Sequence, residues 1–279
     1  MEVILAKTRG FCFGVKRAIE MARKLVAEPG ATCAYCLGEL IHNPQVVRQL
    51  EQKGLRVVSA PSEADPGASL LIRSHGVSPA VEREARRRGL KIVDATCVLV
   101  RRAQKLVRQL HEEGYRVVII GDADHPEVRS VLGCAPGIIC IDSAEQIDKL
   151  SPCQKMGVIS QTTQPVEHFG DMVGRIAAKG CPELKVVNTI CRETQQRQSS
   201  ALDVAGKVEV MFVLGGRGSA NTTHLAQLCR GVCARTYHLE GWDQFRPEMA
   251  SGGRRAGLTG GASTPEWTID QFATELEKI

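Results

Sequence analysis

The chain repeats one layout three times, and this repetition constrains the fold more than any other feature of the sequence. Each copy has an apolar segment, then a cysteine, then a basic segment whose apolar residues recur at helical spacing. Self-similarity on this scale predicts repeated supersecondary units, and strands alternating with helices predict an α/β architecture with mostly parallel sheets. We therefore expect three pseudo-repeated α/β units at residues 1–95, 96–187 and 188–279, with the C-terminal segment of the third returning toward the first.

The cysteines of the three copies are Cys12, Cys97 and Cys191. Each stands between the end of an apolar strand and the start of a helix. Because parallel strands present their carboxyl ends at one edge of a sheet, three such units around a common centre would direct the three thiols into one cavity. A triplication without any functional centre would explain the strands and helices, but not a cysteine in each first loop.

Two more loops recur in register in every copy. A strand end, a glycine and a short polar loop precede a helix at His42, at His125 and at Asn221. The third loop reads IRSHGVSP in the first copy, ISQTTQP in the second and LTGGASTP in the third. Imidazole, hydroxyl and amide groups beside helix starts are typical of sites for phosphate oxygens. Neither RGSANT (residues 217–222) nor GGASTP (residues 260–265) matches a P-loop, so nucleotide hydrolysis is disfavoured.

Three thiolates from separate units suit zinc or an iron–sulfur cluster. Structural zinc usually takes a fourth ligand, often from a CxxC pair, and none of the three cysteines belongs to such a pair. Three-thiolate ligation that leaves one iron of a [4Fe–4S] cluster open would suit a substrate-activating site. With 11 cysteines and no secretory signal, a disulfide framework is not expected. The remaining cysteines are interpreted as packing residues: Cys33 and Cys36 (a CxxC pair), Cys134, Cys140, Cys153, Cys181, Cys229 and Cys233. For the CxxC pair, redox activity or adventitious metal binding is the alternative.

Composition narrows the class of ligand. The net charge of +5 is a mild basic bias, which favours a small anionic ligand and falls short of a nucleic-acid footprint. Aromatic residues make up only 4% of the chain, which argues against stacking on single-stranded nucleic acid. No apolar run approaches the roughly 20 residues of a membrane-spanning helix, and the N-terminus has no targeting pattern, so we expect a cytoplasmic protein without a membrane or nucleic-acid partner.

A candidate acid stands two residues beyond His125, in the segment DHPE. Inside a partly dry cavity, burial would raise the pKa of the Glu127 carboxyl and let it deliver a proton near neutral pH. Alternatively, Glu127 is a first-turn glutamate that favours the helix dipole, after Pro126 at the first helical position.

Nine segments in order resemble the 4-hydroxy-3-methylbut-2-enyl diphosphate reductase family, also called LytB or IspH. They are GFCFGVKRA, HNPQVV, RSHGV, DATC, DHPEV, SQTT, NTIC, SAN and GAS, and they cover nearly the whole chain. The resemblance implies a trefoil of three α/β units around one central [4Fe–4S] cluster per chain. It also implies that the cluster is held by three cysteine ligands, Cys12, Cys97 and Cys191.

The resemblance further implies a two-electron reductive dehydroxylation, the last step of the non-mevalonate (MEP) isoprenoid pathway. The products would be isopentenyl and dimethylallyl diphosphate. Glu127 matches the proton-delivering glutamate, and Thr162 matches a threonine that hydrogen-bonds the substrate hydroxyl. Thr163 also matches a residue that contacts the substrate. Thr194 matches a residue that lies behind those that contact the substrate. The diphosphate ligands implied are His42, His75, His125, Ser219, Asn221 and Ser263. One departure is visible, since Ala220 stands where many relatives have a second serine, and we expect a modest effect on affinity.

The sequence does not identify the electron donor. A reduced ferredoxin or flavodoxin is the expected class, since its acidic surface could face basic helices of this chain; alternatively, these charges are only a solvated helix face. Two alternatives remain open at this point. One is a non-catalytic zinc protein with a fourth ligand from His42, His75 or His125; the other is a redox-neutral phosphate-binding module such as a transferase. A protein with a cluster is brown, whereas both alternatives are colourless.

Overall fold

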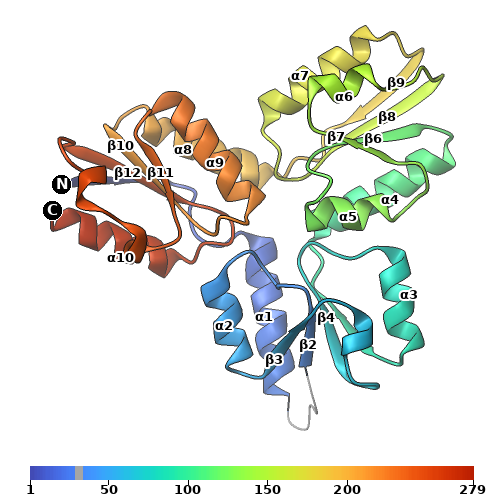
Figure 1. Ribbon diagram of the computed structural model, residues 1–279, viewed down its shortest axis with the longest axis horizontal. Helices are drawn as coiled ribbons and strands as arrows, with labels where there is room; N and C mark the ends of the chain where they lie inside the picture. The colour runs from blue at the N-terminus through green and yellow to red at the C-terminus, as the bar shows by residue number, and fades with distance from the viewer. Residues whose placement is uncertain (29–33) are drawn as a thin grey trace. The chain divides into compact units, whose positions relative to one another are not determined.

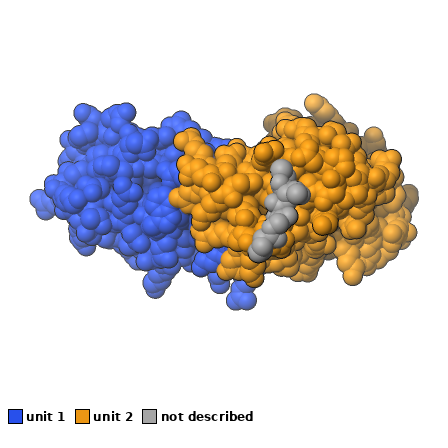
Figure 2. Space-filling model, turned by 90° about the horizontal axis from the view of Figure 1, so that it is seen from below, with its two compact units in different colours: residues 1–16, 41–46, 192–279 blue, residues 17–40, 47–191 orange. Residues whose placement is uncertain are grey.

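The computed structural model describes residues 1–28 and 34–279. The chain divides into two compact units, coloured separately in Figure 2: unit 1 contains residues 1–16, 41–46 and 192–279, and unit 2 contains residues 17–40 and 47–191. The strands of the described residues form three four-stranded sheets, and all strand pairs in these sheets are parallel. The expected α/β class is therefore confirmed, with a separate parallel sheet in each of the three repeats.

Unit 2 contains two of the sheets. One has the strand order β3-β2-β4-β5, and its strands are β2 (Ala34–Leu37), β3 (Leu55–Val58), β4 (Ser69–Ile72) and β5 (Lys91–Asp94). Along this part of the chain run α1 (Phe13–Ala27), α2 (Pro44–Glu51), the 3₁₀ helix η1 (Pro61–Glu63) and α3 (Pro79–Arg87). The chain passes between the two units four times: within α1, at residues 40–41, within α2 and at residues 191–192.

The other sheet of unit 2 has the order β7-β6-β8-β9. Its strands are β6 (Arg116–Ile120), β7 (Ile139–Ile141), β8 (Lys155–Ser160) and β9 (Glu183–Val187). Figure 1 shows α4 and α5 on one side of this sheet and α6 and α7 on the other. These helices are α4 (Val98–Glu112), α5 (Pro126–Leu132), α6 (Ala144–Asp148) and α7 (Val166–Ala178).

The sheet of unit 1 joins the two ends of the described chain. Its order is β1-β12-β10-β11, with β1 (Glu2–Leu5), β10 (Val210–Leu214), β11 (Thr236–Leu239) and β12 (Arg255–Gly260). Its helices are α8 (Arg192–Ala205), α9 (Ala220–Val232), α10 (Glu266–Glu277), η2 (Trp242–Gln244) and η3 (Pro247–Met249). Because β1 pairs with β12, the first strand of the first repeat lies in the sheet of the last repeat. The boundaries expected from the sequence, 1–95, 96–187 and 188–279, stay a prediction.

The buried cores follow from strands whose side chains alternate between two covered faces. In β6, Val118 and Ile120 pack with residues of α6 and α7, while Val117 and Ile119 pack with residues of α4 and α5. In β10, Phe212 packs with residues of α10, whereas the adjacent residues pack with α8 and α9. Both faces of these strands are buried, which explains why their sequences are continuously apolar rather than alternating.

Helix starts fall where the loop sequences predict them. Pro79 and Pro126 occupy the first position of α3 and α5, after the N-cap residues Ser78 and His125. A proline can stand there because its missing N–H would have no partner inside the helix. The repeated polar loops therefore lie between the carboxyl end of each strand and the helix start that follows it.

Candidate functional site

The residues singled out from the sequence all lie in segments that follow the C-terminal end of a parallel strand. Such segments gather at one edge of their own sheet, where open α/β folds bind ligands. Unit 1 contains Cys12, His42, Ser219, Asn221 and Ser263, and unit 2 contains His75, Cys97, His125, Glu127, Thr162, Thr163 and Cys191.

In unit 2, the carboxyl of Glu127 is 3% exposed and is bound by a single residue of the neighbouring loop. Thr162, after β8, donates its backbone N–H to Oε1 and its hydroxyl to Oε2, each over 2.7 Å. Burial raises the pKa of Glu127 above its ordinary value, and the two hydrogen bonds from Thr162 oppose that rise. A carboxyl in such surroundings can keep its proton closer to neutral pH, which suits a general acid. Glu127 is also in the first turn of α5, but its carboxyl is buried against Thr162 rather than solvated.

The imidazole of His125 is oriented by the same helix start. Its Nδ1 accepts a hydrogen bond of 3.2 Å from the backbone N–H of Glu127, as an N-cap of α5. A neutral imidazole that accepts at Nδ1 has its proton on Nε2, so that nitrogen is a donor. The ring of His75 meets the ring of His125 edge-on, with centroids 5.4 Å apart. Two of the predicted imidazoles are thus adjacent, and both lie at the edge of unit 2 that holds Glu127.

The thiols of Cys97 and Cys191 lie close enough to influence one another. Burial raises the pKa of Cys97, the backbone N–H groups of Leu99 and Val100 lower it, and the charges of Cys191 and Glu127 raise it further. Both backbones are fixed by neighbouring loops: Cys97 N–H donates to the carbonyl of Ser74 (2.9 Å), and Cys191 N–H donates to that of Thr162 (2.9 Å). Two thiols, a buried carboxyl and the threonine that binds it therefore form one connected group in unit 2.

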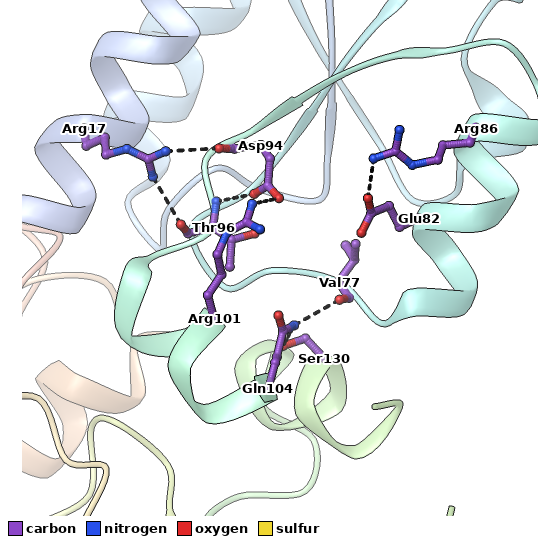
Figure 3. Close-up of polar contacts among 9 residues, drawn as sticks. All are labelled: Arg17, Val77, Glu82, Arg86, Asp94, Thr96, Arg101, Gln104 and Ser130. Atoms are coloured by element: carbon purple, nitrogen blue, oxygen red, sulfur yellow. Dashed lines mark hydrogen bonds and ion pairs between the residues drawn. The ribbon is translucent and has the colours of Figure 1, made fainter. Parts of the chain in front are cut away.

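Polar contacts at the end of β5 hold the segment that leads into Cys97 (Figure 3). The guanidinium of Arg17, from α1, donates to the carbonyls of Thr96 (3.1 Å) and Asp94 (3.3 Å). The Asp94 carboxylate accepts from the backbone N–H of Thr96 at 2.8 Å and pairs with Arg101 of α4. The backbone before Cys97 is thus fixed by groups from α1 and from the first turns of α4.

Gln104 of α4 contacts both the His75 loop and α5 (Figure 3). Its Nε2 donates to the carbonyl of Val77 (3.1 Å), two residues after His75, and to the hydroxyl of Ser130 (3.2 Å). Ser130 in turn donates to the backbone carbonyl of Glu127 over 2.7 Å. Gln104 therefore links the helix that follows Cys97 to the His75 loop and to the helix that bears Glu127.

In unit 1, the Cys12 loop packs against the loop after β12. The backbone N–H of Cys12 donates to the carbonyl of Ala262 over 3.1 Å, next to Ser263. The Cys12 sulfur accepts from the backbone N–H of Val15 at 3.4 Å, inside the first turn of α1. A helix N-terminus favours the thiolate form, which is the form that binds metal.

Arg197 of α8 fixes both of these loops from inside unit 1. Its side chain is 1% exposed, and its two terminal nitrogens donate to the carbonyls of Gly260 (2.7 Å) and Gly10 (2.8 Å). Glu193, one turn earlier, lies 3.9 Å from the guanidinium and accepts from the backbone N–H of Phe13 at 3.3 Å. Charged hydrogen bonds thus flank Cys12 on both sides.

The predicted anion ligands of unit 1 lie at helix starts. Ser219 caps α9, where its hydroxyl accepts from the Thr222 N–H at 3.4 Å. Asn221 is buried, and its Nδ2 has no hydrogen-bond partner among the described residues. Asn43, which caps α2, donates from Nδ2 to the carbonyl of Ser263 over 3.0 Å. The Asn221 amide, a buried donor without an acceptor among the described residues, therefore suits a ligand oxygen.

Close backbone approach explains two glycines in this region. A Cβ at Gly261 would lie 2.0 Å from the Thr222 hydroxyl oxygen. A Cβ at Gly215, where φ is +142°, would lie 2.6 Å from the hydroxyl oxygen of Thr264. Only glycine allows the backbone after β12 to approach Thr222 of α9, and that after β10 to approach Thr264, this closely.

Sequence reasoning missed Gln104, Arg197 and Asn43. Arg197 and Gln104 are helix residues whose partners are backbone carbonyls of distant loops, and such contacts leave no periodic pattern. Asn43 had a usable signal, because an asparagine directly before Pro44 is a typical helix cap. Of the cysteines predicted to be packing residues, Cys36, Cys229 and Cys233 are confirmed as buried, while Cys33 lies outside the described residues.

Two comparisons place this geometry among known proteins. Residues 3–277 match the model of the family described as LytB protein. The curated proteins named 4-hydroxy-3-methylbut-2-enyl diphosphate reductase from Geotalea uraniireducens and Caldanaerobacter subterraneus are 45% and 40% identical to this chain; each alignment covers 100% of the chain and 98% of the relative.

Solved structures agree with the sequence relatives. A structure of (E)-4-hydroxy-3-methyl-but-2-enyl diphosphate reductase, titled the terminal enzyme of the non-mevalonate pathway, matches with a TM-score of 0.72 at 40% identity, over 100% of this chain and 99% of that one. The Plasmodium falciparum E-1-hydroxy-2-methyl-but-2-enyl-4-diphosphate reductase matches with a TM-score of 0.94 at 26% identity, over 99% of this chain and 87% of that one. Among the described residues, the helices are all too short or too polar to cross a membrane.

Proposed function

The chain belongs to the LytB protein family, and on this premise we propose that it reduces 4-hydroxy-3-methylbut-2-enyl diphosphate to isopentenyl and dimethylallyl diphosphate. The relatives that share its full length bear the name of this reductase. The observation that supports the chemistry best is the connected group of unit 2, in which a buried carboxyl with a raised pKa lies close enough to the Cys97 thiol for its charge to act on it.

Members of this family are iron–sulfur enzymes, and we assign one [4Fe–4S] cluster to the three thiols of Cys12, Cys97 and Cys191. The donor chemistry fits, because thiolates are the usual ligands of such clusters and each of these cysteines directly precedes a helix. Backbone N–H groups already face the sulfur of Cys12 and that of Cys97, and hydrogen bonds of this kind stabilise bound thiolates. When bound, the cluster supplies the two electrons of the reduction and a Lewis-acidic iron.

Glu127 and Thr162 handle the proton in this proposal. The Thr162 hydroxyl donates to Glu127 Oε2 over 2.7 Å; when Glu127 carries the proton at Oε2, this hydroxyl turns to accept from it and donates its own hydrogen to the substrate. From Oε2 the proton passes through Thr162 Oγ1 to the hydroxyl of the substrate, which leaves as water. A second proton completes the product. Thr163, which lies in the same loop as Thr162, is assigned as a further substrate contact.

The diphosphate is assigned to six side chains: His42, His75, His125, Ser219, Asn221 and Ser263. Three features of these side chains, each within a single unit, support the assignment. His125 has its proton on Nε2, Asn221 has a buried donor without a partner among the described residues, and Ser219 stands at the N-terminus of α9. Ala220 offers no hydroxyl to the diphosphate, so the backbone N–H of the same turn is the expected replacement.

The electron donor is proposed to be a reduced ferredoxin or flavodoxin. Such donors have acidic surfaces, and α4 presents the exposed cations Arg101, Arg102 and Lys105. Since α4 starts directly after Cys97, this surface would bring a donor near one of the assigned ligands.

The test begins with anaerobic purification, an absorption spectrum and quantification of iron and sulfide. We expect a brown protein that converts the diphosphate substrate with reduced methyl viologen as donor. In the variant Cys97→Ser the visible absorption and the turnover are both lost, whereas Cys134→Ser, a half-buried thiol of the same unit, keeps both. A colourless protein that binds stoichiometric zinc would refute the proposal in favour of a structural zinc site.

A further inference from the structure

Outside the candidate site, unit 2 brings a second pair of thiols together. The sulfur atoms of Cys153 and Cys181 lie 3.9 Å apart, although 28 residues separate the two cysteines in the sequence. Both are predicted from the sequence to be packing residues, and each is half-buried. Their adjacency is a product of the fold and has no signal in the local sequence.

The pairing of two strands explains why the cysteines meet. Lys155 and Glu183 are register partners at the start of the parallel pair β8 and β9, and their side chains form an ion pair of 3.0 Å. Cys153 and Cys181 each stand two residues before these partners, and the Glu183 N–H still donates to the Gln154 carbonyl at 3.1 Å. The two cysteines therefore stand just before the first register pair of neighbouring strands, which brings their sulfur atoms within 3.9 Å of each other.

The pair is also accessible to a small molecule. Both cysteines line a cavity of about 690 Å³ on the surface of unit 2, together with Pro152, Lys179 and Pro182. This cavity lies at the amino ends of β8 and β9, whereas Thr162 and Cys191 follow their carboxyl ends. The thiol pair is therefore separate from the candidate site, although the same two strands lead to both.

We propose that Cys153 and Cys181 form an intramolecular disulfide by exchange with a low-molecular-weight disulfide such as oxidised glutathione. One cysteine sulfur attacks the small disulfide, forms a mixed disulfide and releases one small thiol. The second cysteine then attacks the mixed disulfide and releases the other small thiol. Two protein thiols lose two electrons and two protons, and the small disulfide gains both, so the exchange balances.

The surroundings of the sulfurs predict a slow exchange. Burial and the hydrogen bond with Cys181 raise the pKa of Cys153, while the charge of Arg116 lowers it. The Cys181 thiol donates to the carbonyl oxygens of Cys153 and of Glu183, each at 3.4 Å, so its sulfur must leave these contacts before it can attack. Because the thiolate is the attacking form, the disulfide should form faster at mildly alkaline pH and persist until a reductant is added.

Trypsin makes the test direct, because it releases each cysteine in a separate short peptide, residues 150–155 and 180–185. The full-length protein is incubated with oxidised glutathione, its remaining thiols are alkylated, and the digest is examined by mass spectrometry. We expect one species in which the two peptides are joined, and its conversion to two alkylated peptides after reduction. Two glutathione adducts without a joined species, or two unreacted thiols, would overturn the proposal.

Thermal unfolding gives a second readout. A cross-link between β8 and β9 should raise the unfolding temperature of the oxidised protein by roughly 5 °C. The variant Cys153→Ser should lose this shift, and Cys134→Ser should keep it. Neither readout depends on a cluster or on turnover. The disulfide proposal can therefore fail without affecting the proposed reductase function, and the reductase function can fail without affecting the disulfide result.

Discussion

Replacing Arg197 should lower the free energy of unfolding of unit 1 more than substitution of any exposed residue in that unit. The variant Arg197→Met keeps much of the side-chain length but removes a guanidinium that is 1% exposed and that donates to Gly260 and Gly10. A hydrogen bond to a charged group contributes about 1.5–3 kcal/mol, and the carbonyls left behind are in a site closed to water. Glu193 is partly exposed, so its carboxylate can regain water. We therefore expect a loss of about 3–5 kcal/mol in the free energy of unfolding.

The assay uses the only two tryptophans of the chain. Trp242 and Trp267 both belong to unit 1, so their fluorescence during urea unfolding follows this unit separately from unit 2. The matched control is Arg255→Met, which removes an exposed ion pair of 3.0 Å with Glu209 and should lower the free energy of unfolding far less than Arg197→Met does. If both variants lost the same small amount, the buried hydrogen bonds of Arg197 would not stabilise the Cys12 loop as described.

Three further outcomes are expected. Because burial holds the pKa of Glu127 above its ordinary 4.5, the native state binds this proton more tightly than the unfolded state, and stability from this group falls as pH rises above 4.5. In Glu127→Gln this fall in stability should be absent. Urea unfolding of both proteins at about pH 5 and about pH 8 measures it, and an equal change in the free energy of unfolding with pH in the two proteins would contradict the prediction. Gln104→Ala should lower turnover roughly tenfold or more by loosening the loop contacts, while Gln109→Ala on the same helix, paired only with exposed Glu113, leaves it unchanged. In thermal unfolding, Gly261→Ala should cost about 1–3 kcal/mol because its methyl group would overlap a threonine side chain, whereas Gly231→Ala, with open space around it in α9, should add about 0.5 kcal/mol.

The repeated elements were predictable because their signals are local. A buried strand such as Arg116–Ile120 is a short apolar run that ends at Gly121, and Pro126 marks the helix start after it. The cysteine, histidine and hydroxyl loops follow from the same pattern, since the carboxyl end of each strand determines which residues reach the edge of the sheet. These rules depend on only a few neighbouring residues.

Long-range contacts were not predictable in this way. That β1 pairs with β12 depends on the register between residues more than 250 positions apart, and that Cys153 meets Cys181 depends on the register of β8 and β9. The roles of Gln104 and Arg197 depend on carbonyl groups whose positions only the folded loops determine. The sequence therefore predicts which residues reach each edge, but not what holds them there.

The pairing of β1 with β12 also has a consequence for the order of folding. The two sheets of unit 2 use strands from residues 34–94 and 116–187, so each can form as soon as its own segment has left the ribosome. The sheet of unit 1 cannot close until residues 255–260 have been synthesised, because β12 lies between β1 and β10. Until then β1, one of the first segments to emerge, has no strand to pair with. Contacts across so long a stretch of chain slow folding, and we expect the completion of this sheet to be the last step in the maturation of the protein.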